Sequence, residues 1–459
     1  MIIMKFGGSS QRDVAAYERV FQAVKARTGK RPLVVLSAVG KTTDGLLEAA
    51  SMASRGRHKA AHEKGTRLEE EHLAIASGLM GGENLRRTRG GIEKFFEEVR
   101  RLLLHIEDDG FLRPQLQDEV LARGELLSTW IFHNLLLSRG VDSAYLDARR
   151  LVRSDDRYTR AHVDETATFQ SLRGAWEAES GKVCVLQGFI ASGPSGETTT
   201  IGRGGSDLTA CLAGAALGAD EIQVWTDVPG ILTADPRLVA EALKIKSISF
   251  DEAAELAYFG AKVLHPAALI PAIARDIPVY VLDSAHIERP GTFISAREVP
   301  SRTPIKSIAC KPGISILNIN SPRMLLAYGF ARRIFDVFDR RRIPVDVIAT
   351  SEVNVSVTID REDEIGQLVS DLGALGDVQV RGSMAIVSVV GHSLPRSIGL
   401  PARVFKAVED IEVRLISQGA SRTNLTFLVE EEHMRAAVRR IHQTFFDDPD
   451  PEVFERLSA

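Results

Sequence analysis

The chain has 459 residues, which is too long for a single hydrophobic core and predicts two or three domains. Hydrophobic residues make up 44% and charged residues 26%, as in an ordinary soluble globular protein, and a formal net charge of −4 argues against nucleic acid or an anionic membrane as a partner. Three widely spaced cysteines without metal-ligand spacing are typical of a reducing cytoplasm, and no apolar run is long enough to span a membrane. Because Met1 leads directly into an apolar strand, no signal peptide is expected.

The first predicted strand, Ile2–Phe6, ends at the turn Gly7-Gly8-Ser9-Ser10, and a helix is predicted over Asp13–Arg27. This order exposes backbone N–H groups at the carboxyl end of a strand, where α/β sheets bind ligands. Lys5 lies inside the strand beside the glycines, which favours a phosphate-facing role over that of a solvated lysine on an edge strand. The turn is not a P-loop, because the lysine precedes the glycines.

A second buried strand, Leu33–Leu36, runs into the hydroxyl-rich turn Ser37–Thr43, which is either another ligand loop or a plain turn. Residues 44–137 are predicted to be mostly helical, with many charges on solvated faces. Within this block Gly124 interrupts the helical pattern beside Glu125. Taken alone, Glu125 would be an exposed helix carboxylate.

A glycine-rich stretch, Thr198–Asp207, follows the predicted strand Val183–Ile190 and leads into an apolar helix, Leu208–Leu217. Its successive N–H groups can converge on an anion, and the helix that begins near Ser206 adds the positive end of its dipole. Arg203 offers a planar fork suited to a carboxylate or phosphate. A surface turn with a Ser/Asp cap is the alternative, but three such loops after strands favour a ligand site.

Two further strands, Glu221–Trp225 and Ile277–Leu282, continue the alternation of strands and helices. The first runs into a long polar turn, Thr226–Arg237, which is a candidate nucleotide loop because of its position. Ser249 and Glu252 have the spacing of a capping box at a helix start. The pattern predicts an α/β fold with an open, largely parallel sheet and helices on both faces.

The composition changes near Arg289–Thr303, where a domain boundary is predicted. Two copies of a βαββαβ-type order follow, beginning at the predicted strands Gly313–Ile319 and Ala385–Val390, and they suggest a duplicated ferredoxin-like α+β module. In the first copy a strand is expected over Val345–Ile348. The predicted domains are residues 1–298, 299–380 and 381–459, with the last two possibly interleaved.

At this point the chain resembles the aspartate kinases, which combine an amino-acid kinase fold with two C-terminal ACT modules. The resemblance covers essentially the whole chain and is closest to the monofunctional, lysine-sensitive branch. It rests on motifs that are moderately specific alone and highly specific in this order: Lys5–Ser10, Arg123–Ser128, Thr198–Asp207, Trp225–Arg237, Phe259–Pro266 and Pro344–Glu352. The chain departs from the usual pattern at Leu232, where a tyrosine is common.

The resemblance implies ATP-dependent phosphorylation of the L-aspartate side chain, the first step towards lysine, threonine and methionine, with ATP and Mg²⁺ as cofactors. It implies Lys5 and Asp207 as catalytic residues, with Asp207 orienting Lys5. No protein ligand for a metal is assigned. The implied ATP contacts are Lys5, Gly7, Gly8, Ser9, Thr226, Asp227, Leu232, Arg237, Lys262 and Val263. The implied aspartate contacts are Ser37, Thr43, Glu125, Arg203 and Ser206.

The ACT pair implies feedback by an amino acid, with lysine favoured and threonine possible, in a homodimer or higher homo-oligomer. The implied effector residues are Met324, Tyr328, Val345, Asp346, Ser351 and Glu352. From the residues alone, Asp346 and Glu352 are either partners for an effector ammonium or solvated charges. Two other functions stay open: another amino-acid kinase acting on acetylglutamate, glutamate or carbamate, and an inactive ACT sensor. No fused dehydrogenase is expected.

Overall fold

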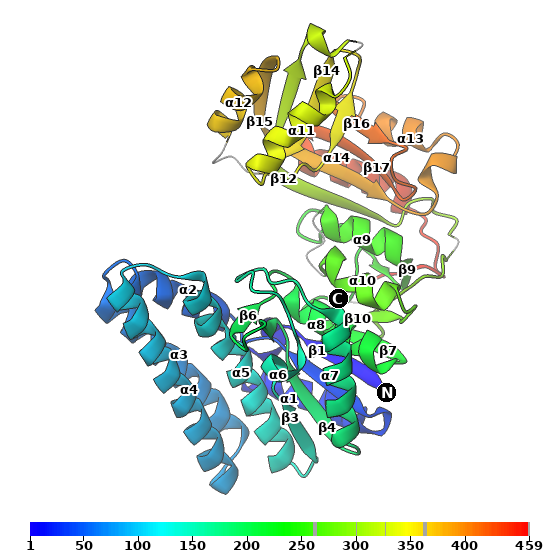
Figure 1. The fold of residues 1–459 in the computed structure, drawn as a ribbon. Helices are drawn as coiled ribbons and strands as arrows, with labels where there is room; N and C mark the ends of the chain where they lie inside the picture. Colours follow the sequence, from blue (N-terminus) through cyan, green and yellow to red (C-terminus); the bar gives the residue numbers. More distant parts are fainter. Residues whose placement is uncertain (260–263, 300, 326, 361–364, 458–459) are drawn as a thin grey trace. The chain divides into compact units, whose positions relative to one another are not determined.

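The structure is a computed structural model that describes residues 1–259, 264–299, 301–325, 327–360 and 365–457. The chain divides into two compact units (Figure 1). We name the two units after the domains that the resemblance implies. The kinase unit comprises Met1–Ile231 and Val263–Arg297, and the regulatory unit comprises Leu232–Lys262 and Glu298–Ala459. The segment Leu232–Lys262 thus clusters with the C-terminal part of the chain.

The kinase unit is built on a mostly parallel sheet in which neighbouring strands follow the order β3-β4-β2-β1-β7-β10-β11. All of these pairs are parallel except β10 with β11. The strands are β1 (Ile2–Phe6), β2 (Pro32–Leu36), β3 (Ser143–Leu146), β4 (Val183–Gln187), β7 (Glu221–Thr226), β10 (Val279–Asp283) and β11 (Thr292–Ser295). The sheet confirms the predicted fold class.

Strand β1 lies at the point where the order of strands along the sheet reverses. The chain continues from β1 to β2 on one side, whereas β7 flanks β1 on the other side, with Lys5 in register with Val35 and Val224. Ligands of open α/β sheets bind at the carboxyl ends of strands at such a switch point. The topology therefore predicts a ligand site at the loop that follows Phe6.

Helices cover the sheet and extend one end of the unit. They are α1 (Val14–Lys25), α2 (Thr42–Ala53), α3 (His58–Leu79), α4 (Gly82–Asp109), α5 (Pro114–Ser138), α6 (Ala148–Leu151), α7 (Glu165–Ala178), α8 (Gly205–Leu217) and α10 (Ile270–Ile273). Figure 1 shows α3 and α4 as a long pair beside α5. Helix α5 is buried along most of its length, which explains why its polar residues can reach the interior of the unit. A small hairpin pairs β5 (Ile190–Ser192) with β6 (Thr198–Thr200).

The regulatory unit contains an antiparallel sheet in the order β13-β14-β12-β15-β17-β16. Its two long strands pair over both halves of their length, so that Ser307–Lys311 lies against Ile386–Val390 and Ile314–Asn320 against Asp377–Met384. The strands are β12 (Ser307–Asn320), β13 (Ile348–Thr350), β14 (Asn354–Ile359), β15 (Asp377–Val390), β16 (Leu415–Gln418) and β17 (Asn424–Glu430).

The helices of this unit are α9 (Phe250–Tyr258), α11 (Phe330–Arg340), α12 (Ile365–Gly373), α13 (Leu400–Ala407) and α14 (Glu431–Phe446). Short strands β8 (Lys244–Ile245), β9 (Ser247–Ser249) and β18 (Phe454–Glu455) complete it, with β8 paired to β18. The core of the first module packs α11 and α12 against β12 and β14. The α+β composition confirms the predicted ferredoxin-like character.

Three predicted boundaries were wrong for identifiable reasons. The strand expected to reach Ile190 ends at Gln187, because the chain turns at Phe189 with a φ of 68°. Thr198–Thr200 form a strand instead of part of the glycine loop. The strand expected from Val345 begins at Ile348, because the Asp346 N–H and the Val347 carbonyl both bond to the Thr358 backbone, and two residues opposite one break the regular register of the strand pair.

Candidate active site

The end of β1 carries a buried ion pair. The Nζ atom of Lys5 lies 2.6 Å from Oδ1 of Asp207, and the two side chains are 12% and 10% exposed. Lys5 comes from the central strand, and Asp207 from the first turn of α8. Both are therefore held by rigid elements while they remain partly open to a ligand, and the ammonium is oriented at the switch point of the sheet.

The glycine-rich loop lets the backbone turn sharply into α8. Gly202 and Gly204 both adopt a φ of 77°, in the left-handed region that glycine enters without a steric penalty. A Cβ at Gly204 would also lie 2.4 Å from the Cβ of His265. At the start of α8 the Gly205 N–H donates to the Gly202 carbonyl, and the positive end of the helix dipole lies at this loop, which is suited to an anion.

Two serines join the loop after β2 to the start of α8. Ser37 Oγ donates to Ser206 Oγ at 2.9 Å, and Ser128 Oγ on α5 donates to the Ser37 carbonyl at 2.6 Å. The turn after β1 is packed against the same loop, because a Cβ at Gly8 would lie 2.7 Å from the Gly40 carbonyl oxygen and 2.8 Å from that of Ala38. The three strand-end loops therefore form one connected surface.

Glu125 on α5 is the second charged group of this surface. It is only 3% exposed, and its Oε1 accepts from the Ala38 N–H at 3.3 Å. Burial raises the pKa of this carboxyl to about 8. Its Oε2 is buried and has no hydrogen-bond donor among the residues that the structure describes. A buried carboxylate oxygen without a donor is suited to a ligand cation such as an ammonium group.

The other residues implied for the substrate lie on the same loops. Thr43 is in the first turn of α2, directly after the Ser37–Gly40 loop, and is half-buried. Arg203 is exposed in the glycine loop. Ser9 lies in the short helical turn after β1. Gly7 donates its N–H to the Trp225 carbonyl at 3.3 Å, which joins this turn to the end of β7.

The residues implied for the nucleotide are divided between the units. Thr226 and Asp227 end β7 in the kinase unit, where the Thr226 hydroxyl donates to Asp227 Oδ1 at 3.2 Å. Leu232 and Arg237 belong to the regulatory unit, where Arg237 pairs with Asp235 at 2.6 Å and the Leu232 carbonyl accepts from Ser307 Oγ at 2.8 Å. Lys262 and Val263 lie outside the described residues.

Sequence reasoning missed two residues that support the site. Asp118 on α5 accepts from the N–H groups of Thr159 and Thr200 and from the Thr200 hydroxyl, and it thereby holds β6, which leads into the glycine loop. Ser128 holds the Ser37 carbonyl, as described above. Each would be taken for a solvated residue of a charged helix, since only the burial of α5 distinguishes them.

The implied effector residues all lie in the first module of the regulatory unit. Met324 ends the short helix η4 (Pro322–Met324), and Tyr328 is fully exposed shortly before α11. Val345 and Asp346 precede β13, and Asp346 is largely buried. Ser351 and Glu352 are exposed in the turn between β13 and β14.

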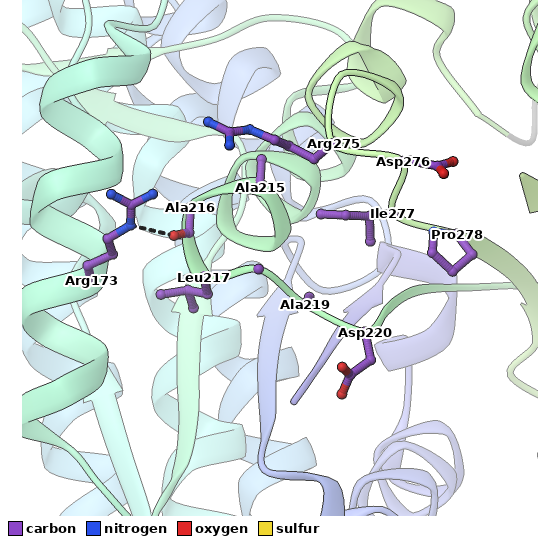
Figure 2. Close-up of a pocket in the computed structure, with 11 residues that line it drawn as sticks. Arg173, Ala215, Ala216, Leu217, Ala219, Asp220, Arg275, Asp276, Ile277 and Pro278 are labelled. Carbon is purple, nitrogen blue, oxygen red and sulfur yellow. Dashed lines mark hydrogen bonds between the residues drawn. The ribbon is translucent and has the colours of Figure 1, made fainter. Parts of the chain in front are cut away.

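A separate hollow in the kinase unit, of about 530 Å³, lies at the opposite end of α8 from Asp207 (Figure 2). Arg173 projects towards it from α7 and donates from Nε to the Ala216 carbonyl at 2.7 Å. This arginine therefore caps the last turn of α8, where a cation also complements the helix dipole. That contact gives the arginine a structural role in the kinase unit.

Within the described part of the chain, one group of side chains has metal-ligand spacing: Glu430, Glu432 and His433. It lies near the surface of the second module and has no further sign of a metal site. None of the described helices is long and apolar enough to cross a membrane.

Taken together, the kinase unit brings a lysine ammonium, a carboxylate that orients it, glycine-rich strand-end loops and a second buried carboxyl group to one surface. Such an arrangement can hold the phosphates of a nucleotide beside a small zwitterion. It offers little to a reaction that needs a strong base, because Asp207 is already engaged with Lys5.

Comparisons with known proteins indicate an amino acid kinase domain followed by ACT modules. The model of the amino acid kinase family matches residues 1–283, and an ACT domain model matches residues 317–365 and 387–445. Lysine-sensitive aspartokinase 3 of Escherichia coli (strain K12) is 36% identical over 465 residues, covering 97% of this chain and 99% of that protein.

Two crystal structures of E. coli aspartokinase III are also similar to the chain. The complex with aspartate and ADP has a TM-score of 0.86 at 35% identity, covering 97% of this chain and 100% of that one. The complex with lysine and aspartate has a TM-score of 0.80 at 36% identity, covering 97% and 99%. The chain therefore belongs to the amino acid kinase family, and within it to the aspartokinases.

Proposed function

We infer that this protein is an aspartate kinase, which transfers the γ-phosphoryl group of ATP to the side-chain carboxylate of L-aspartate and forms 4-phospho-L-aspartate and ADP. The reaction opens lysine, threonine and methionine biosynthesis. The observation that carries this proposal is the Lys5–Asp207 pair, held at 2.6 Å on the loop surface that also contains Glu125. The similar structure with aspartate and ADP supports the choice of substrates.

Aspartate recognition is assigned to the groups around Glu125. Its Oε2 would accept the substrate ammonium, which would fill the position that lacks a donor. Arg203 would bind a carboxylate through its planar fork, and Ser37, Thr43 and Ser206 would add hydroxyl contacts. Since both the ammonium and a carboxylate are then fixed, the other carboxylate is directed towards the phosphate.

Phosphoryl transfer then needs positive charge and positioning more than acid–base chemistry. A carboxylate nucleophile is already ionised at neutral pH, so no general base is required. Lys5 and the Gly8 amide would stabilise the charge on the transferring group, with Asp207 keeping the Lys5 ammonium in place. Gly7, whose N–H donates to the Trp225 carbonyl, would line the loop beside the phosphates. Mg²⁺ would arrive with ATP and neutralise part of the phosphate charge.

The remaining ATP contacts are proposed for Ser9, Thr226, Asp227, Leu232, Arg237, Lys262 and Val263. The kinase-unit members lie at the ends of β1 and β7, and a nucleotide bound at the switch point would lie at these strand ends. The leucine at position 232 can neither stack a ring on the base of the nucleotide nor donate a hydrogen bond, as a tyrosine side chain could. The nucleoside would therefore have an apolar contact at this position.

The ACT modules indicate feedback by an amino acid, with lysine favoured, as the similar structure with lysine and aspartate suggests. The proposed pocket consists of Met324, Tyr328, Val345, Asp346, Ser351 and Glu352. Assembly into a homodimer or higher homo-oligomer through the ACT modules, and a cytoplasmic location, complete the proposal.

The test is an assay of ADP release with ATP and one acceptor at a time: aspartate, glutamate, acetylglutamate or carbamate. Turnover with aspartate alone is expected. Turnover with another acid and none with aspartate would contradict the proposal, and no turnover with any acceptor would favour an inactive ACT sensor. Titration with lysine and threonine, separately and together, tests the choice of effector.

A further inference from the structure

Helix α9 in the regulatory unit is held by three side chains on successive turns. Glu252, Glu255 and Tyr258 are spaced three residues apart, so they lie along one side of the helix. The helix packs beside the long strands β12 and β15, which run through both ACT modules (Figure 1). The contacts of α9 with these strands therefore involve both modules.

The first two side chains are firm anchors. Glu252 is fully buried and accepts from Lys306 Nζ at 3.2 Å as well as from Ser249. Glu255 accepts from Ser421 Oγ at 2.7 Å and from Asn424 Nδ2 at 2.6 Å, both in the second module. Neither carboxylate contacts a residue assigned to the effector.

The third contact is different, because it uses an assigned effector residue. The Tyr258 hydroxyl donates to Asp346 Oδ1 at 2.8 Å, and Lys311 Nζ donates to Asp346 Oδ2 at 2.9 Å. The Lys311 ammonium also lies 5.8 Å from the centre of the Tyr258 ring. The Asp346 side chain is 6% exposed, so each of its oxygens already has a donor inside the protein.

An effector ammonium can reach this carboxylate only by replacing one of those donors or by sharing an oxygen with it. We propose that the ammonium group of the feedback amino acid competes with Tyr258 and Lys311 for the Asp346 carboxylate, so that effector binding releases the C-terminal end of α9. The proposal rests on the effector site assigned above, and it explains how occupation of that site is transmitted.

The end of α9 that would be released lies close in the chain to a residue assigned to ATP. Tyr258 is the last residue of α9, whereas Glu252 and Glu255 hold its earlier turns. Lys262, which the resemblance assigns to ATP, follows Tyr258 closely in the chain. Loss of one hydrogen bond at this end frees the last turn of α9, from which the chain continues to Lys262 in sequence, while the two anchors keep the rest of α9 in place.

The test measures lysine binding to the full chain by calorimetry, together with inhibition of turnover. Tyr258→Phe removes the competing hydroxyl and keeps the ring, and Lys311→Met removes the competing charge. Both variants should bind lysine more tightly than the unaltered chain, by about fivefold for the loss of one hydrogen bond, and saturating lysine should lower their turnover less. Tyr280→Phe, on β10 of the kinase unit, is the matched control and should bind lysine as the unaltered chain does.

The outcomes separate the two proposals. Lysine binding to Tyr258→Phe with unchanged or weaker affinity, while the unaltered chain binds lysine, would overturn the competition and leave the effector site standing. Absence of lysine binding to the unaltered chain would overturn both. Tighter binding without a smaller maximal inhibition would overturn the transmission through α9.

Discussion

A buried lysine–carboxylate pair lies in each unit of the molecule, and the two pairs differ in what surrounds them. In the kinase unit Lys5 and Asp207 are 2.6 Å apart and 12% and 10% exposed. In the regulatory unit Lys306 and Glu252 are 3.2 Å apart and only 2% and 1% exposed. The first pair opens onto a surface of loops, whereas the second is enclosed.

The difference shows that the type of ion pair does not determine its role. Glu252 also closes the capping box of α9 by accepting from the Ser249 N–H and hydroxyl, so its charge is committed to local structure. Asp207 stands in the first turn of a helix that follows a glycine loop, where a ligand can approach Lys5. Access, and what else each carboxylate binds, distinguish the pair for which we propose a catalytic role from the structural pair.

The largest expected effect is on turnover, from Lys5→Ala. Removing the ammonium deletes positive charge at the transferring phosphoryl group and should lower kcat by about a thousandfold or more. The fold should persist, because the replaced side chain is partly open. ADP release and the circular dichroism spectrum measure the two quantities. Lys30→Ala, which removes an exposed lysine paired with Glu221, is the control, and equal turnover in the two variants would exclude Lys5 from the chemistry.

The corresponding change in the second pair, Lys306→Met, should affect stability. It leaves the Glu252 charge buried without its partner, which typically costs about 3–5 kcal/mol. The urea midpoint for unfolding of the regulatory unit should fall, and adding Glu252→Gln should recover part of the loss. Lys246→Met is the control, because that side chain is exposed and donates to the Pro451 carbonyl instead of a buried carboxylate. Equal midpoints for Lys306→Met and Lys246→Met would contradict the structural role.

A third change tests the ammonium site. Measured above the pKa of about 8 at which the Glu125 carboxyl ionises, Glu125→Gln should raise the KM for aspartate by about tenfold to a hundredfold, since the charged partner of the substrate ammonium is lost. Glu93→Gln, on the exposed face of α4, should leave KM unchanged. A KM for aspartate that is the same in both variants would remove Glu125 from substrate binding.

The same carboxyl predicts a pH dependence. Burial raises the pKa of Glu125 to about 8, so the group is largely neutral below that pH and attracts an ammonium only above it. The kcat/KM for aspartate should therefore increase as the pH rises through about 8, and Glu125→Gln should lose this increase. An increase of the same size in the variant would assign it to another group.

The smallest expected effect comes from Gly8→Ala. The added Cβ would approach two carbonyl oxygens at 2.7 and 2.8 Å, so the loop after β1 must shift. A loss of about 1–3 kcal/mol in stability and a higher KM for ATP are expected. Gly29→Ala is matched to it, because a Cβ there meets nothing within 4 Å. Thermal unfolding and ATP titration of both variants decide whether this close packing matters.

Much of the kinase unit could be predicted from sequence, because short apolar strands followed by glycine or hydroxyl residues have a local signature. The β1 turn, the start of α8 and the capping box at Ser249 follow from such patterns and are confirmed. The pairing of Lys5 with Asp207 joins positions far apart in the chain, and the resemblance to a family supplied it.

Other features could not be predicted, because they depend on packing. Glu125 and Asp118 read as solvated helix charges, and only the burial of α5 gives them their environment. The clustering of Leu232–Lys262 with the C-terminal unit is a property of tertiary contacts that no local pattern records. The buried partner of Glu252, Lys306, lies in a stretch without a recognisable motif.

The most direct test of the difference between the two pairs is the turnover of Lys5→Ala and Lys306→Met across a urea series. Lys5→Ala should be inactive without urea although it is folded there, and its unfolding midpoint should fall less than that of Lys306→Met, because Asp207 is more open to solvent than Glu252. Lys306→Met should be active without urea and should lose its activity at a lower urea concentration. Loss of kcat in Lys306→Met without urea, or full activity of Lys5→Ala, would contradict this account.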